Sequence, residues 1–182
     1  LRPDPLLVAM AAAERNRTRE MPDQAEDSDP DIRMSAVNRK GIIVGTTVMV
    51  LTQIVMTAIM TMTPVHMQHH GHDLGDVGIV IGIHVAAMFL PSLITGVLVD
   101  RFGPVAMSYV SGMTLLLSGL LAAYVPGDSM GMMILALALL GLGWNFGFIS
   151  GTTALVDATP PQVRAKTQGA VDVLIALGGA SG

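Results

Sequence analysis

The chain has 182 residues, of which 51% are hydrophobic and only 13% are charged. A soluble domain carries about 25% charged residues, so this composition, with a mean hydropathy of +0.59, argues against a soluble protein. There is no cysteine, which excludes a disulfide framework and thiol chemistry. Of the 10 basic and 14 acidic residues, 15 lie within residues 1–40, and the others fall in short gaps between apolar runs, apart from Asp172. This distribution predicts a membrane protein with a polar leader.

The leader, residues 1–40, is expected to be cytoplasmic and largely disordered. Residues 18–32 are rich in acids and poor in large apolar side chains, so they cannot bury enough surface to offset the entropy of ordering. Leu6–Arg19 is the one stretch with the composition of a short helix on the membrane surface. Because the first residue is Leu and the last residues lie inside an apolar run, we interpret the chain as a fragment.

Four uncharged runs after the leader reach the roughly 20 residues that a helix needs to span a bilayer. A fifth run is shorter and carries Asp172 near its start. None of them alternates apolar and polar residues as barrel strands do. The prediction is therefore an all-α integral membrane protein with four full transmembrane helices and one truncated helix. The expected helices are about 41–63, 76–99, 104–125, 130–156 and 167–182.

The Lys and Arg residues beside the runs predict the orientation of the helices, because short cytoplasmic loops are enriched in them. Five successive flanks carry 2, 0, 1, 0 and 2 of these residues. We therefore expect the leader, the turn at 100–104 and the loop at 157–167 to be cytoplasmic. The gaps at 63–76 and 126–129 are expected to face outside.

The turn GVLVDRFGP, residues 96–104, places an acid beside a base between two apolar runs. Gly96 permits close approach to a neighbouring helix, and Gly103 before a proline forces a short return. Asp100 lies where a helix emerges and can face the positive end of another helix, whereas Arg101 can reach a carboxylate. The alternative is an ordinary turn with one polar pair.

This turn resembles the loop signature of the major facilitator superfamily, a family of twelve-helix secondary transporters. The signature, G-x-L-x-D-R-x-G-R-[KR], lies between helices 2 and 3 and recurs in a degraded form between helices 8 and 9. The matching residues are Gly96, Leu98, Asp100, Arg101 and Gly103. Pro104 and Val105 stand where the signature has two basic residues, which favours the degraded second copy.

The later gap, residues 157–169, is similar to a second element of the family. Asp157 and Arg164 are separated by six residues, as are the acid and the arginine that many members carry after helices 4 and 10. The acid there is commonly Glu, so Asp157 has a shorter reach. Two gaps that match in the right order, with one helix pair between them, are more specific than either gap alone.

The resemblance implies that the chain covers the central cytoplasmic loop, helices 7 to 10 and the first part of helix 11, within a C-terminal six-helix bundle. It implies a multi-pass secondary transporter of the plasma membrane that moves a small solute by alternating access against an N-terminal six-helix half. Proton-coupled efflux, as an antiporter, is the usual mode. It also implies a cytoplasmic clasp. We expect Arg101 to reach Asp157, and Asp100 or Asp172 to lie near Arg164 or near the start of a facing helix.

Two rows of small residues spaced by four predict close helix packing, since packing rather than water drives helix association in lipid. The rows are Gly143, Gly147 and Gly151 in one run and Gly78, Gly82 and Ala86 in another. Pro91 removes one backbone hydrogen bond from its run and predicts a kink there.

Polar side chains inside the runs mark candidate sites, because they are costly in lipid and usually face a cavity or another helix. Gln53, Thr57, His84 and Asn145 are the substrate-cavity candidates, since transporter sites lie near the midplane. Hydrogen bonding between helices without solute contact is an equal alternative for each. His84 is the candidate for proton coupling, the alternative being a neutral histidine that donates to a neighbouring helix. We assign Trp144 to packing.

The gap at 63–76 contains four histidines. His66 and His70, at i and i+4, have the spacing of metal ligands on a helix, but Gly71 and the expected loop favour an exposed, pH-sensitive segment ending at His72. We expect no bound metal, no cofactor and no nucleic-acid partner.

Two other functions were weighed against transport. A polytopic membrane scaffold or assembly subunit would have no water-accessible cavity around the polar candidates. An intramembrane enzyme is disfavoured, because the sequence has no H-E-x-x-H motif, no Ser-His pairing and no paired intramembrane aspartates.

Overall fold

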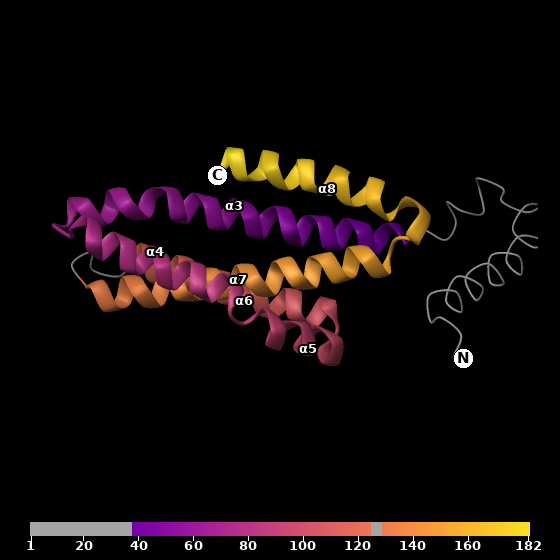
Figure 1. Ribbon diagram of the computed structural model, residues 1–182, viewed down its shortest axis with the longest axis horizontal. Coiled ribbons are helices and arrows are strands. Elements are labelled where there is room, and N and C mark those ends of the chain that lie inside the picture. The colour runs from indigo at the N-terminus through magenta and orange to yellow at the C-terminus, as the bar shows by residue number, and fades with distance from the viewer. Residues whose placement is uncertain (1–37, 125–128) are drawn as a thin grey trace, which may run out of the picture. The chain divides into compact units, whose positions relative to one another are not determined.

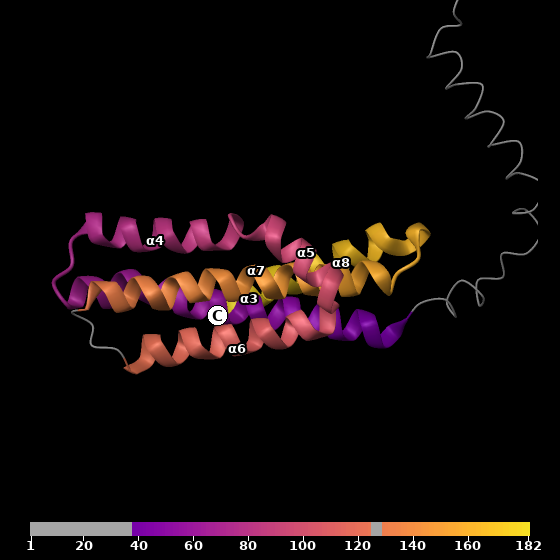
Figure 2. The ribbon, with the colours of Figure 1, turned by 90° about the horizontal axis from the view of Figure 1, so that it is seen from below.

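The structure, a computed structural model, describes residues 38–124 and 129–182. These residues form the helices α3 (Arg39–His69), α4 (Leu74–Phe89), α5 (Ser92–Phe102), α6 (Pro104–Tyr124), α7 (Met130–Asp157) and α8 (Pro161–Ser181). Helix α7 is central and packs against α6, α3 and α4, whereas α8 packs against α3. Figure 1 shows α8 lying along α3, and Figure 2 shows α4 and α6 on opposite sides of α7. The expectations for residues 1–37, including the helix at Leu6–Arg19, lie outside the described residues.

The length and composition of these helices fit a membrane. Helices α3, α6 and α7 are each long and apolar enough to cross a bilayer, and α4 with α5 makes a fourth span if the bent pair is counted as one. Helix α8, which carries Arg164, Lys166 and Asp172, is not among the candidate spans in the described part of the chain. The expected all-α fold is confirmed.

Three helix boundaries differ from the predictions. Helix α3 continues through Pro64 to His69 instead of ending near residue 63, because Met67 on its last turns is completely buried against Val80 and Met133. Helix α4 begins at Leu74, where Asp73 and Asp76 form a reciprocal capping box.

Helix α8 begins at Pro161, so the loop expected at 157–167 shortens to a turn of three residues, 158–160. Proline is favoured at the first position of a helix, since its missing N–H would have no partner there in any case. The predicted truncated helix at 167–182 therefore starts one and a half turns early.

Pro91 breaks the second span as predicted. Helices α4 and α5 are bent by 41° at Leu90–Pro91. Pro91 cannot donate to the carbonyl of Ala87, and its ring disfavours a straight helix. The Leu90 N–H still donates to the Ala86 carbonyl, and the Thr95 N–H donates to that of Pro91, so each half keeps its own ladder.

The small-residue row of α7 is buried against two neighbours. A Cβ at Gly143 would stand 2.9 Å from Leu115 of α6, and one at Gly147 would overlap Thr52 of α3 and Ser111 of α6. Two serines of α6 donate hydrogen bonds to backbone carbonyls of α7. The two serines are seven residues apart, and so are the two carbonyls. Ser111 donates to the Gly143 carbonyl at 2.7 Å, and Ser118 donates to that of Ala136 at 2.7 Å.

The second predicted row does not pack in this way. A Cβ added at Gly78, Gly82 or Gly96 would meet no atom within 4 Å among the described residues. The expectation that Gly96 and the Gly78 row bring helices into contact is therefore not met within this unit. The reason is that α4 instead meets α7 through Gly141, where a Cβ would overlap the His84 carbonyl.

Candidate solute site

Polar and aromatic side chains from three helices meet near the middle of the spans. Gln53 lies near the middle of α3, Trp144 near the middle of α7, and Phe89 is the last residue of α4 before the break. Helix α8 passes the same level, since a Cβ at Gly179 would lie 3.3 Å from Gln53 Nε2. We call Gln53, Thr57, Phe89, Trp144 and Phe148 the mid-span cluster.

The Gln53 amide ties α3 to α7. The Trp144 indole N–H donates to Gln53 Oε1 at 3.1 Å. Gln53 Nε2 donates to Thr57 Oγ1 at 3.3 Å, and the Thr57 hydroxyl donates to the Gln53 carbonyl at 2.9 Å. All three side chains are half-buried. The structure thus brings together the predicted candidates Gln53 and Thr57, and adds Trp144 to them.

The aromatic side chains of the cluster form an ordered platform. Trp144 stacks on Phe148 with ring centroids 4.8 Å apart and planes inclined by 14°. Phe89 meets Trp144 edge-on at 6.2 Å and 66°. Phe148 packs against the buried group of Met49, Leu155 and Val171, which supports the platform from behind. Phe89 is 60% exposed.

Asn145 is buried and bound to the broken span. Its Nδ2 donates to the Met88 carbonyl at 2.7 Å and to Ser92 Oγ at 2.9 Å, and its Oδ1 accepts from the Thr95 hydroxyl. In a continuous helix the Met88 carbonyl would accept from the N–H of Ser92. Asn145 therefore uses most of its hydrogen-bonding capacity to hold the break, and little is left for a solute.

His84 is also buried, between α4 and α7. Its ring is 1% exposed, and Nδ1–H donates to the Leu137 carbonyl at 2.9 Å. Nε2 has no hydrogen-bond partner among the described residues. The structure thus keeps His84 apart from the mid-span cluster and gives it the interhelical bond that was the alternative to proton coupling.

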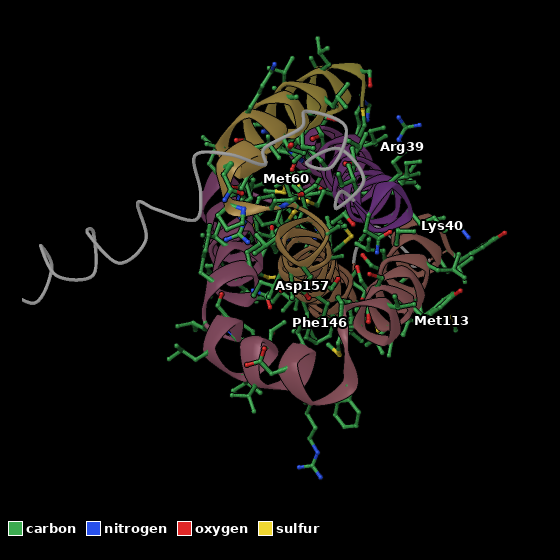
Figure 3. All side chains as sticks on the ribbon, turned by 90° about the vertical axis from the view of Figure 1, so that its right-hand side faces the viewer. Arg39, Lys40, Met60, Met113, Phe146 and Asp157 are labelled. Atoms are coloured by element: carbon green, nitrogen blue, oxygen red, sulfur yellow. The ribbon has the colours of Figure 1, made fainter. Side chains whose placement is uncertain are left out.

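The predicted clasp residues lie on helix ends at turns. Gly103, at φ +84°, is the single residue between α5 and α6, so Asp100 and Arg101 belong to the last turn of α5 and not to a loop. Both side chains are exposed, as is Asp157 at the end of α7. Figure 3 shows Asp157 seen from the end at which α3 begins with Arg39.

The pair expected between Arg101 and Asp157 is not formed in this structure. Within the described residues no carboxylate pairs with Arg101, whereas His72 Nδ1 lies 3.4 Å from Asp76 Oδ2. The Arg101 guanidinium lies 5.8 Å from the centroid of the Phe102 ring. Helices α4 and α5 are bent by 41° at Leu90–Pro91, and Figure 1 shows that α5 stops short of the α7–α8 turn.

Arg164 bonds backbone carbonyls at the α7–α8 turn instead of the expected carboxylate. Its Nη2 donates to the carbonyls of Val156 at 3.3 Å and Thr159 at 3.2 Å, and no carboxylate from the described residues bonds it. A cation that bonds the last carbonyls of a helix stabilises its C-terminal end. Arg164 thus fixes the geometry of this turn.

The histidine-rich gap is mostly helical. His66 and His69 belong to α3, and the His66 and His70 rings are 4.4 Å apart. The His70 Nδ1 lies 2.9 Å from the His66 carbonyl. No group of three or more metal-ligating side chains forms within the described residues. The predicted loop is therefore wrong up to His69.

Many transporter folds have broken helices and polar groups near the bilayer midplane. The family model of the Major Facilitator Superfamily matches residues 6–182, and the chain belongs to this family. The predicted resemblance is confirmed.

Three relatives show what the chain is similar to. It is 62% identical over 182 residues to the uncharacterized MFS-type transporter YdeG of Bacillus subtilis (strain 168), and 55% identical to YddS of the same organism; both matches cover all of this chain and 41% of the relative. The riboflavin transporter RfnT of Brucella anthropi is 39% identical over 120 residues, which are 66% of this chain and 30% of that protein. No solved structure matches the chain.

Proposed function

We propose that this chain belongs to a secondary active transporter that moves a small solute by alternating access. The chain spans 41% of the length of the two relatives that match all of it. In this proposal the bundle moves against an N-terminal six-helix half of the same protein. The observation that carries the proposal is the mid-span cluster beside the break at Pro91. Broken helices at the midplane expose backbone and polar groups where a solute binds.

Within this proposal the polar candidates take different roles. Gln53 and Thr57 contact the solute, because their side chains are half-buried and keep hydrogen-bonding capacity. Asn145 positions α5 through its bonds to the break. His84 carries the coupling proton through Nε2, which has no partner among the described residues. The mode is proton-driven efflux across the plasma membrane, with residues 1–40 on the cytoplasmic side.

The test is transport in proteoliposomes that contain the product of the complete gene. With an imposed proton gradient, one member of a solute panel should move saturably, and a protonophore should abolish the movement. The panel includes riboflavin, since one relative is named as its transporter. His84→Gln should flatten the pH dependence of the rate. Binding without movement of any solute would instead support a membrane scaffold.

We also propose that Gly96, Asp100, Arg101, Gly103, Asp157 and Arg164 form the inside gate. The structure gives Arg101 no carboxylate within the described residues, so the pair with Asp157 would form when the bundles rock and α5 approaches α7. An exposed ion pair is worth about 0–1 kcal/mol, enough to bias a two-state equilibrium of a few kcal/mol when several act together.

Charge reversal tests the gate. Arg101→Asp should lower the transport rate several-fold, because the closed state loses a contact, and adding Asp157→Arg should restore part of the rate by recreating the pair with the charges exchanged. The rates are measured at equal amounts of folded protein in the liposomes. Additive losses in the double variant would contradict the pairing.

A further inference from the structure

The mid-span cluster has a composition that restricts what it can bind. No Asp, Glu, Lys or Arg occurs in residues 41–65, 77–99 or 130–156, which are the parts of α3, α4–α5 and α7 around the cluster. A charged solute would find no opposite charge on these three helices, and the exposed carboxylate of α8, Asp172, lies about two turns before Gly179. Desolvation of a charge without a close partner is costly in a site of low dielectric constant. The cluster therefore favours a neutral solute.

The aromatic rings of the cluster determine its shape preference. Trp144 is held on one face by Phe148, at 4.8 Å and nearly parallel, and Phe89 stands edge-on beside it with 60% of its surface exposed. Aromatic rings bind flat π-systems in offset-stacked or edge-to-face geometry. An exposed ring next to a supported indole is thus a surface for a planar aromatic molecule.

The Gln53 amide adds a directional contact at the edge of this platform. An amide side chain has two N–H donors and two acceptor lone pairs. The described residues use one donor, toward Thr57, and one lone pair, toward Trp144. One donor and one acceptor of the amide remain, which matches the number of groups on a ring edge that carries a C=O and an N–H.

We infer that the mid-span cluster binds a neutral, planar heteroaromatic solute with a cyclic amide edge, which stacks against Trp144 and Phe89 and pairs with Gln53. This inference rests on the proposed transport function and names the substrate class of the same site. Cyclic amides fused to aromatic rings combine the flat surface and the paired donor and acceptor that the cluster complements.

The test compares two probes that share the amide edge and differ in planarity. 2-Quinolone is a flat bicyclic lactam, and decahydroquinolin-2-one is its saturated, puckered counterpart. Binding to the purified product of the complete gene is measured in detergent by equilibrium dialysis. We expect 2-quinolone to bind about ten-fold more tightly, the size of one stacking contact.

Variants assign that preference to the cluster. Trp144→Leu should remove the preference for the planar probe, whereas Trp144→Phe, which keeps a ring, should retain most of it. Gln53→Leu should weaken the binding of both lactams. The matched control is Phe146→Leu. Phe146 is an aromatic residue two positions after Trp144, so its side chain leaves the helix about 200° around from that of Trp144. Figure 3 places Phe146 on the side of α7 away from α8, and its loss should change neither affinity.

The outcomes separate this inference from the transport proposal. Equal binding of both probes, no binding of either, or equal losses in Trp144→Leu and Phe146→Leu would overturn the inference, even if other solutes are transported in the liposome assay. A planar preference that depends on Trp144, but with no solute transported, would support the site and contradict the transport function.

Discussion

Single side chains take over bonds that the backbone of the broken span gives up. The amide of Asn145 reaches across from α7 and donates to the Met88 carbonyl, while its oxygen accepts from Thr95 on the far side of Pro91. Backbone groups in a bilayer have no water to bond, so a break at mid-span needs such a partner. One residue of α7 thus holds both halves of the span.

Asn145→Leu should lower the free energy of unfolding by about 1–3 kcal/mol, because it leaves buried polar groups without partners at nearly constant volume. Thermal unfolding in detergent micelles measures the loss. Thr95→Val should cost less, and the double variant should cost less than the sum of the two, since the residues share one hydrogen bond.

The matched control is Thr114→Val on the exposed face of α6. Its hydroxyl bonds only the Val110 carbonyl of its own helix, so the substitution should change the stability by no more than about 0.5 kcal/mol. Strict additivity of Asn145→Leu and Thr95→Val would contradict the proposed role of Asn145.

At this scale the sequence predicted which residues matter but not what they contact. Gln53, Thr57, His84 and Asn145 were selected because polar groups are costly in lipid, and all four make hydrogen bonds in the structure. The partners of His84 and Asn145 lie 50 or more residues away, and no local pattern identifies them. The bond from Trp144 to Gln53 depends on the same tertiary placement. The sequence alone therefore predicts packing for Trp144.

Among the secondary elements, the broken span α4–α5 sets the geometry of the site. The 41° bend at Pro91 ends α4 at Phe89, and so leaves that ring beside Trp144. The same span ends with Arg101, which forms no pair with Asp157 in this structure. The break at Pro91 therefore shapes the aromatic platform.

Pro91→Ala should straighten this span, because alanine restores the N–H that can bond the Ala87 carbonyl. Spin labels at Leu74 and Phe102, both exposed, should then move apart by about 3 Å, given a rise of 1.5 Å per residue in each arm. Double electron–electron resonance measures the distance. The control is Pro104→Ala at the first position of α6, where proline causes no break, and there the distance should not change.

An unchanged distance in Pro91→Ala would show that Asn145 and the neighbouring packing hold the bend without the proline.

The positions of the helix ends depend partly on local sequence and partly on tertiary packing. Hydrophobic runs predicted the middle of each span, but Met67 extends α3 by burial. Likewise, the Gly78 row and the Gly143 row have the same spacing of four residues and both predict helix packing. In this unit the Gly143 row of α7 packs against other helices and the Gly78 row does not.

On the scale of the whole molecule, the turns alternate between two ends of the bundle. The α5–α6 and α7–α8 turns lie toward the end where α3 begins, and the turn after His70 lies at the other end (Figures 1 and 2). Arg101 and Arg164 belong to the helix ends beside the first two turns. This matches the alternation of basic residues and supports the proposed orientation. The mid-span cluster lies between these two ends, which is where the proposed alternating access would need it.

The reactivity of a cysteine at Thr57 tests this account most directly. The chain has no cysteine of its own, so single cysteines at Thr57, Asp73 and Lys166 can be compared in oriented membrane vesicles with an impermeant thiol reagent. We predict that Asp73→Cys reacts only from outside, Lys166→Cys only from the cytoplasmic side, and Thr57→Cys from either side, with the transported solute slowing that reaction. If Thr57→Cys reacts from neither side while the other two react as predicted, the cluster has no aqueous access and the transporter account is contradicted.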